Sequence, residues 1–281
     1  MSPEGGGRDA VLVSSGEDHY HPRWSPDASS ILTRRIVGGV TAEVGLIAPD
    51  GSQLVLLTDG ENANAFGYAV NWSADGERVA FGSIRPEGTY VWVVSRLGGA
   101  PERLFPGLTE EHREAVWSPD GSRIAYSAQI GSGRRRDLFI SNSDRPEEAV
   151  NLTRGRVYAP GFLSWSPDGT RIAFASATLL PDGSPEPGAP SAEVNYVAPD
   201  NEIFVIDVES TELTRITDNG VLELTPAWSP DGTSLLFTSD RDGDPDLWLV
   251  SLAAPDEPRN LIDDADDPHD DAIADWYWGP R

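Results

Sequence analysis

Three of the four histidines lie a few residues before a tryptophan that opens a recurring tetrapeptide. His19 and His112 each stand five residues before such a tryptophan, and Glu223 takes the same place in another copy. The position three residues before the tryptophan is held in different copies by His21, Glu114, Thr225 and Asp275. Imidazole and carboxylate groups are suitable ligands for divalent metals, so a metal site is one interpretation. Solvated polar loop residues are the other.

The only basic cluster in the chain is the run Arg134, Arg135 and Arg136. Guanidinium groups bind carboxylates through paired hydrogen bonds, so this run could hold a carboxylate or an acidic peptide. Arginines on a solvated loop would show the same pattern. The sequence leaves both interpretations open.

The segment Asp240–Asp246 has aspartate at every second position, as calcium-binding loops do. It departs from the EF-hand pattern, because its glycine comes fourth and Ser251 stands where the twelfth-position glutamate should be. We therefore expect a structural turn here, and the sequence predicts neither a metal nor a cofactor.

The composition excludes several kinds of catalytic site. The 281 residues include no cysteine and no lysine, which excludes thiolate nucleophiles, cysteine-ligated zinc, Schiff-base lysines and P-loop lysines. No Gly-x-Ser-x-Gly elbow and no His-Glu-x-x-His sequence occurs. The sequence therefore predicts a protein that is not an enzyme.

The charge also limits the kinds of partner. The formal net charge of −25 comes from 46 acidic residues against 21 basic ones, all of them arginine. A field this negative repels phosphate backbones and anionic lipid head groups, so we expect no binding to nucleic acid or to a membrane surface. No apolar run is long enough to span a bilayer.

The recurring tetrapeptide marks an internal repeat that must position these side chains. Trp-Ser-Pro-Asp or Trp-Ser-Ala-Asp occurs five times, and a degraded copy, Trp-Gly-Pro-Arg, begins at Trp278. The five tryptophans are Trp24, Trp72, Trp117, Trp165 and Trp228, and the aspartates of the same copies are Asp27, Asp75, Asp120, Asp168 and Asp231. The steps between tryptophans are 48, 45, 48, 63 and 50 residues, which is a spacing typical of β-propeller blades.

Each copy has the same internal order. A turn follows the tryptophan, in which proline, aspartate and glycine favour a tight reversal of the chain. Two longer β-rich runs and a shorter one come next, as at Arg171–Ala175, Glu202–Ile206 and Leu213–Thr217. With the short strand that leads into the tryptophan, each copy predicts a four-stranded sheet. One sheet cannot bury both of its faces alone, so neighbouring copies must stack.

These motifs resemble the TolB-type, WD-repeat-like propeller family. The resemblance is carried by Trp-Ser-Pro-Asp-Gly, by Arg-Ile-Ala-Phe, by Asp-Leu-Trp-Leu-Val and by Leu-Thr, and it runs from about Asp9 to Trp278. Members of that family include periplasmic Tol-system proteins, sensor or anchoring modules and the propellers of prolyl-oligopeptidase-like enzymes. The resemblance therefore implies the fold strongly and the function weakly.

The number of blades follows from the copies. We expect an all-β propeller with five complete four-stranded repeats and a partial sixth, preceded by a disordered lead at residues 1–8. Within the single domain of residues 9–281, Asp9–Gly16 reads as the last strand of a blade and Asp270–Pro280 as the first strand of one. Since TolB-type rings usually have six blades, a truncated six-bladed ring is favoured, and a closed five-bladed ring is the alternative.

The geometry of a propeller gives the candidate residues a common place. First strands line the central channel, so the histidines, Glu114, Glu223, Thr225 and Asp275 should gather at its mouth, with the arginine run on the loops of the same face. We expect a non-catalytic scaffold, monomeric, that binds a protein or peptide there. The alternatives are the propeller part of a prolyl-oligopeptidase-like enzyme, or a metal-dependent lyase that uses the channel histidines.

The compartment is implied by the resemblance alone. Periplasmic family members suggest an extracytoplasmic location. The glycine-rich start of this chain has no apolar segment of the kind found in signal peptides, so a cytoplasmic location stays open.

Overall fold

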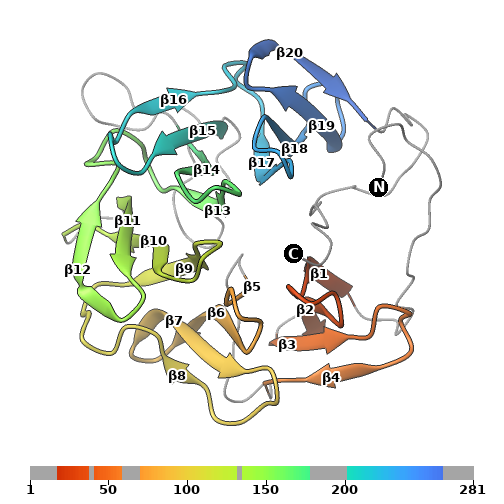
Figure 1. Ribbon diagram of the computed structural model, residues 1–281, viewed down its shortest axis with the longest axis vertical. Coiled ribbons are helices and arrows are strands. Elements are labelled where there is room, and N and C mark those ends of the chain that lie inside the picture. Colours follow the sequence, from red (N-terminus) through yellow and green to blue (C-terminus); the bar gives the residue numbers. More distant parts are fainter. Residues whose placement is uncertain (1–17, 38–40, 59–69, 132–134, 178–200, 262–281) are drawn as a thin grey trace.

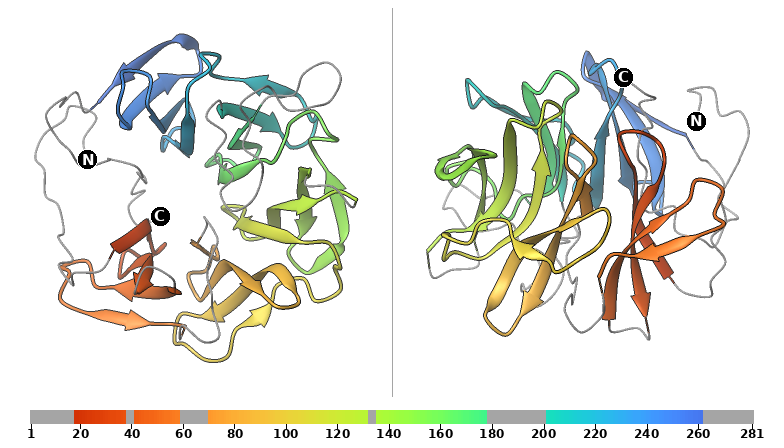
Figure 2. Two further views of the ribbon diagram at one scale, coloured as in Figure 1. Left: turned by 180° about the vertical axis from the view of Figure 1, so that it is seen from behind. Right: turned by 60° about the horizontal axis from the view of Figure 1, so that its bottom comes forward.

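A computed structural model describes residues 18–37, 41–58, 70–131, 135–177 and 201–261. These residues form five four-stranded antiparallel sheets that stand around a common centre as the blades of a propeller (Figure 1). In every blade the chain runs from an inner first strand to an outer fourth strand, and the view from behind shows the same order (Figure 2). The described residues contain no helix long and apolar enough to cross a membrane.

The twenty described strands follow one another from blade to blade. The first blade contains β1 (Asp18–Trp24), β2 (Ile31–Val37), β3 (Thr41–Ile47) and β4 (Leu54–Leu56). The second contains β5 (Val70–Trp72), β6 (Arg78–Arg85), β7 (Gly88–Ser95) and β8 (Glu102–Arg103). The third contains β9 (His112–Trp117), β10 (Arg123–Gln129), β11 (Arg136–Asn142) and β12 (Arg145–Asn151). The fourth contains β13 (Gly161–Trp165), β14 (Arg171–Ser176), β15 (Glu202–Asp207) and β16 (Leu213–Arg215). The fifth contains β17 (Glu223–Trp228), β18 (Ser234–Ser239), β19 (Asp246–Ser251) and β20 (Ala254–Asn260).

The hydrophobic core lies between the blades. Each of the four larger clusters of buried side chains draws on two successive sheets. The cluster between the third and fourth blades, for example, joins Leu138 and Leu152 to Trp165, Ile172 and Phe174. A blade with a neighbour on each side has both faces of its sheet covered. Its second strand is therefore apolar at consecutive positions.

The turn after each tryptophan has one hydrogen-bonding pattern in all five blades. The serine hydroxyl donates to the aspartate two residues on, at 2.5–2.6 Å. That aspartate accepts a backbone N–H two residues further, and the serine oxygen accepts one from the start of the second strand. Four of the turns have glycine at a φ near +70°, a conformation that disfavours residues with a Cβ atom, and Ala28 adopts it in the first blade. The predicted role of this tetrapeptide is confirmed.

A second set of contacts joins each blade to the next. The indole N–H groups of Trp72, Trp165 and Trp228 donate to a backbone carbonyl in the preceding blade, at 3.1–3.2 Å. An arginine at the start of the preceding blade's second strand lies over the tryptophan ring in three cases, with the guanidinium carbon 4.5–5.7 Å from the ring centre. The arginine–tryptophan pairs are Arg78 on Trp117, Arg123 on Trp165 and Arg171 on Trp228.

Burial of the motif tryptophans follows this arrangement. Trp117, Trp165 and Trp228 are at most 8% exposed and pack in the clusters between blades. Trp24 and Trp72 are half-buried instead. Trp72 is covered from its own blade by Arg96, which reaches back to Asp27 of the first blade at 3.1 Å.

The expectation of a partial sixth blade needs correction, because the structure shows five blades. The segments assigned to the sixth, Asp9–Gly16 and Asp270–Pro280, lie outside the described residues, and so does Trp278. Among the residues that the structure does describe, the first and fifth blades do not pack closely on each other as the other neighbours do.

Candidate functional site

The candidate residues belong to the inner strands. Four of the five described inner strands contain a β-bulge at or next to the candidate positions. Residues 21–22, 162–163 and 225–226 each stand opposite a single residue of the second strand, and Arg113 is the extra residue in β9. Phe162 and Thr225 have φ values of +56° and +52°. A bulge breaks the alternation of side chains along a strand. Two residues that would point to the same side of a regular strand can therefore point to different sides when a bulge lies between them.

Glu114 joins the third blade to the fourth. Its two carboxyl oxygens accept the backbone N–H groups of Phe162, at 2.7 Å, and Leu163, at 2.8 Å. These N–H groups belong to the bulge of β13, where the regular ladder does not pair them. Burial raises the pKa of Glu114 to about 7, against the opposing effect of the two N–H groups. Glu114 therefore fixes one inner strand to the next.

His112 is enclosed by aromatic rings. The ring centres of Tyr90 and Phe105 lie 5.3 Å from that of the imidazole, and that of Tyr126 lies at 6.3 Å. Nδ1 lies 2.9 Å from the carbonyl oxygen of Glu110, so it carries the proton of the neutral ring. Desolvation lowers the pKa of His112 to about 4. The imidazole is wholly buried, and the rings around it come from the second and third blades.

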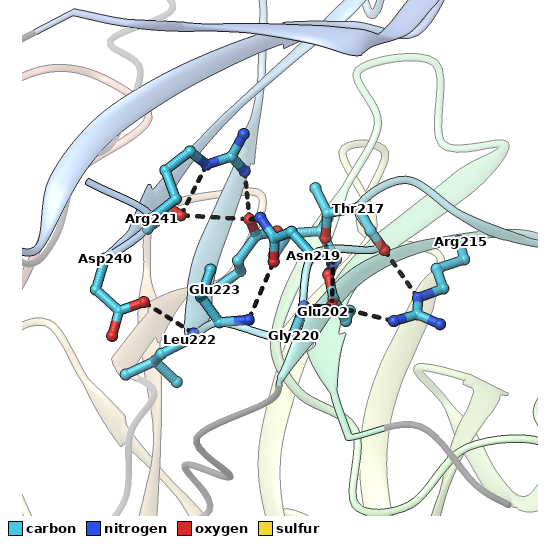
Figure 3. Close-up of polar contacts among 12 residues, drawn as sticks. Glu202, Arg215, Thr217, Asn219, Gly220, Leu222, Glu223, Asp240 and Arg241 are labelled. Carbon is cyan, nitrogen blue, oxygen red and sulfur yellow. Dashed lines mark hydrogen bonds and ion pairs between the residues drawn. The ribbon is translucent and has the colours of Figure 1, made fainter. Parts of the chain in front are cut away.

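Glu223 and Thr225 have partners in the fifth blade and in the loop that leads into it. Glu223 is wholly buried, pairs with Arg241 and accepts the Asn219 side-chain amide at 2.7 Å (Figure 3). Burial raises the pKa of Glu223, against the effects of Thr217, Arg241 and Asn219. The Thr225 hydroxyl lies 3.0 Å from that of Thr238, in the adjacent strand.

The remaining candidates of the channel mouth lie outside the described side chains. His19 and His21 have a described backbone in β1, but their side chains are not described. Asp275 lies outside the described residues altogether. The predicted gathering of histidines therefore stays a prediction.

The arginine run is largely taken up by its own blade. Arg135 donates to the carbonyl of Gly155. Arg136 is buried and lies 3.7 Å from Glu111, and desolvation lowers its pKa to about 9. Arg134 lies outside the described residues.

A cation could be held by carboxylates of the fifth blade. Asp242, Asp244 and Asp246 place oxygen atoms within 4.8 Å of one another, and they are the one such group among the described residues. The Asn260 side-chain amide donates to both Asp242 and Asp246 at 2.7 Å. The amide gives the two carboxylates a structural partner, in agreement with the expected structural turn.

Sequence reasoning missed the role of the acidic residue at the first or second position of the third strand. In the third blade Asp137 accepts the Gly155 backbone N–H, and in the fourth blade Glu202 accepts that of Gly220 at 2.9 Å. The threonine of the Leu-Thr motif makes a further contact, since Thr153 accepts the N–H of Leu138, the residue after Asp137. We call the acidic residue and this threonine, with the N–H groups that they accept, the clamp. The pairing of an acidic residue with a later Leu-Thr was visible in the sequence, but its geometry was not.

In the fourth blade the clamp holds the loop that leads into the fifth blade. Glu202 also accepts the Asn219 backbone N–H at 3.0 Å and pairs with Arg215 at 3.0 Å. The loop between the fourth and fifth blades is therefore held from two sides, by Glu202 of β15 and by Glu223 of β17 (Figure 3).

Two arginines belong to inner strands, Arg23 to β1 and Arg113 to β9. Arg23 of β1 lowers the pKa of Glu114 in β9, although the second blade separates the two strands. Arg113, the bulge residue of β9, is half-buried. Its positive charge contributes to the lowered pKa of Arg136.

Comparisons with known proteins agree with the fold. A protein-family model described as the TolB beta propeller domain matches residues 116–265. A curated relative, the Protein TolB homolog of Chlorobium luteolum, is 26% identical over 180 residues, which are 64% of this chain and 35% of the relative. The Tol-Pal system protein TolB of Desulfosudis oleivorans is 43% identical over 51 residues, 18% of this chain and 12% of that protein. The chain thus spans about a third or less of the length of these relatives.

Solved structures show the same architecture. The structure of a putative TolB from Agrobacterium tumefaciens superimposes with a TM-score of 0.64 at 21% identity, over 88% of this chain and 82% of that one. TolB from Acinetobacter baumannii gives a TM-score of 0.64 at 18% identity, over 87% and 54% of the two chains. A Mycobacterium tuberculosis puromycin-hydrolyzing peptidase gives 0.59 at 15% identity, over 90% and 38%. At these identities the likeness shows the fold alone. Because the family model covers more than half of the chain and the five described blades have its repeat, this protein belongs to the TolB beta propeller domain family.

Proposed function

We propose that the chain is a non-catalytic scaffold that binds a protein or peptide at the centre of its ring. The observation that carries the proposal is the presence of Arg23 and Arg113 on inner strands of a chain whose net charge is −25. Two guanidinium groups on central strands favour an acidic segment of a partner, while the surrounding negative charge disfavours other surfaces.

The rigid frame supports this proposal. Glu114, Glu202 and Glu223 accept hydrogen bonds from the loops and inner strands that join neighbouring blades. A frame held in this way loses little conformational freedom on binding, which favours affinity. Relatives named for the Tol-Pal system make a component of such a system the first partner to examine.

Binding can be tested by isothermal titration of the full chain with purified Tol and Pal components of the same organism. We expect Arg113→Glu to weaken binding by about tenfold or more, because an introduced carboxylate repels an acidic segment. Arg145→Glu is the matched control, since Arg145 is an exposed arginine of the outer strand β12. Equal affinity of the Arg113→Glu and wild-type chains for every bound component would refute the central site.

The enzyme alternatives have weaker support. The likeness to the peptidase is at 15% identity and covers 38% of that chain, so it bears on the fold and not on catalysis. We expect the purified chain to hydrolyse neither esters nor peptides. Turnover that copurifies with the chain through successive columns would overturn this expectation, and a hydrolase domain in the same reading frame would favour the peptidase alternative.

We also propose a monomer in an extracytoplasmic compartment. The names of the Tol-Pal relatives support the compartment. Fractionation of the source cells with a periplasmic marker tests the location, and sedimentation of the purified chain tests the monomer. Recovery with cytoplasmic markers, or a dimer at micromolar concentration, would contradict the respective part.

A further inference from the structure

The loop between the fourth and fifth blades contains Asn219–Gly220, the only Asn-Gly sequence in the chain. Both residues are exposed, and Gly220 has a φ of +69°. In an Asn-Gly pair the backbone nitrogen of glycine can attack the asparagine side-chain amide to form a five-membered imide. Glycine permits this because no Cβ atom obstructs the approach.

Each of the three groups that react in such a step has a partner in this protein (Figure 3). The attacking nitrogen, that of Gly220, donates its hydrogen to Oε1 of Glu202 at 2.9 Å. The amide oxygen of Asn219 accepts the backbone N–H of Val221 at 3.1 Å. The amide nitrogen of Asn219, which is the leaving group, lies 2.7 Å from Oε1 of Glu223.

We propose that Asn219–Gly220 is a self-modification site at which Glu202 serves as the base and Glu223 as the acid. The bond between the Gly220 nitrogen and Cγ of Asn219 forms while the bond between Cγ and Nδ2 breaks. The Gly220 proton passes to Glu202, a proton passes from Glu223 to Nδ2, and ammonia leaves. Water then opens the imide, which leaves aspartate or isoaspartate at position 219.

The surroundings of the two carboxyl groups suit opposite roles. Both groups are wholly buried and each pairs with an arginine, Glu202 with Arg215 at 3.0 Å and Glu223 with Arg241. They differ in their contacts with the loop, because Glu202 accepts its backbone N–H groups, including that of the attacking nitrogen. Glu223 instead contacts the leaving nitrogen, at 2.7 Å, and burial raises its pKa, so its protonated form persists to higher pH than that of an exposed glutamic acid. Two carboxyl groups whose environments differ in this way are a recurrent acid–base arrangement.

The Val221 contact has a further effect. An N–H group aimed at the amide oxygen stabilises the negative charge that this oxygen gains during attack, as donors of an oxyanion hole do. The base, the donor and the acid therefore surround one amide from three sides.

The product would change the joint between the two blades. Aspartate at position 219 replaces an N–H donor by a carboxylate beside the buried Glu223, and two adjacent carboxylates cannot both remain ionised without cost. The contact between Asn219 and Glu223 is lost, while those of Arg241 and Ser239 with Glu223 remain. The modification loosens the hold of the fifth blade on this loop.

The test is peptide mapping by mass spectrometry of the full chain after incubation at neutral and mildly alkaline pH. The same chain unfolded in urea is the reference. We expect acid at position 219 to form faster in the folded chain than in urea, and Glu202→Gln to slow the folded rate by about 10²-fold, the lower end of general acid–base catalysis. The urea rate should not change.

Asn142–Ser143 is an internal control. Asn142 is exposed and its side-chain oxygen accepts the Asp144 N–H at 2.9 Å, but the Ser143 N–H donates to the carbonyl of Ser122 and not to a carboxylate. This asparagine should be modified more slowly in the folded chain than in urea. A folded rate at Asn219 equal to or below the urea rate would overturn the proposal, whether or not the variant folds. A folded Glu202→Gln chain with the wild-type rate would overturn it as well.

Discussion

Replacement of Trp165 tests the interblade packing most directly. The indole is 7% exposed and lies in the cluster between the third and fourth blades. Its N–H donates to the Val116 carbonyl at 3.1 Å, and the Arg123 guanidinium carbon lies 5.2 Å from the ring centre. Trp165→Ala therefore removes apolar burial, one hydrogen bond and one cation–π contact together.

The magnitude follows from these contacts. Burial of roughly 200 Å² of indole surface at about 25 cal/mol per Å² corresponds to about 5 kcal/mol. The hydrogen bond adds about 1 kcal/mol, and relaxation of the neighbours around the cavity offsets part of the total. We expect Trp165→Ala to lower the free energy of unfolding by about 3–5 kcal/mol, a large share of the roughly 5–15 kcal/mol of an ordinary domain. Trp165→Phe keeps most of the ring, so we expect a loss of about 1–2 kcal/mol from the carbonyl left without its donor.

Urea unfolding followed by circular dichroism measures both losses. Leu97→Ala is the control, because Leu97 is 89% exposed and its removal should change the unfolding free energy by less than about 0.5 kcal/mol. A Trp165→Ala chain within about 1 kcal/mol of the wild type would refute the view that the tryptophan side chains hold the blades together.

Three further outcomes are expected. A double-mutant cycle of Arg171→Met and Trp228→Leu, read by urea unfolding, should give a coupling of about 0.5–2 kcal/mol, and a coupling near zero would contradict the cation–π contact. Because the pKa of His112 falls from 6.5 to about 4 on folding, its contribution to stability is complete above pH 6.5 and is lost as the pH falls toward 4. This loss is about 3 kcal/mol and should be absent from the pH profile of His112→Phe; parallel profiles would refute it. Thr153→Val should cost about 1–3 kcal/mol and speed hydrogen exchange at the Leu138 amide, which loses its acceptor; an unchanged exchange rate would show that the clamp does not hold this amide.

The blades could be predicted from the sequence because their determinants are local and repeated. Trp-Ser-Pro-Asp fixes a turn through contacts within six residues, and second strands such as Arg171–Ser176 are apolar at successive positions. Five copies of such a pattern leave little choice of architecture. The inner strands were less predictable, since a bulge depends on how two strands pair and changes which residues face the centre.

The candidate site shows this limit in particular residues. The structure buries His112 among aromatic rings and directs Glu114 to the β13 backbone, two contacts that the sequence pattern does not indicate. Both outcomes depend on residues about 20 to 50 positions away in the chain, such as Tyr90 and Phe162. Arg135 and Arg136 were expected on a loop and are instead engaged by Gly155 and Glu111. A charge that finds a partner in a neighbouring strand cannot be told from a solvated one by sequence alone.

The arginine–tryptophan contact has a consequence for how such rings arise and change. In the second to fourth blades the arginine occupies the sixth position after that blade's own tryptophan and lies over the tryptophan of the next. Each of these blades therefore offers its tryptophan to the preceding blade and its arginine to the following one, at the same positions of the repeat. A gene segment for one of them could be duplicated between two others and would dock on both neighbours without new residues. The fifth blade has Ser234 at this position, so a unit added after it would meet a different surface and would need a joint of another kind.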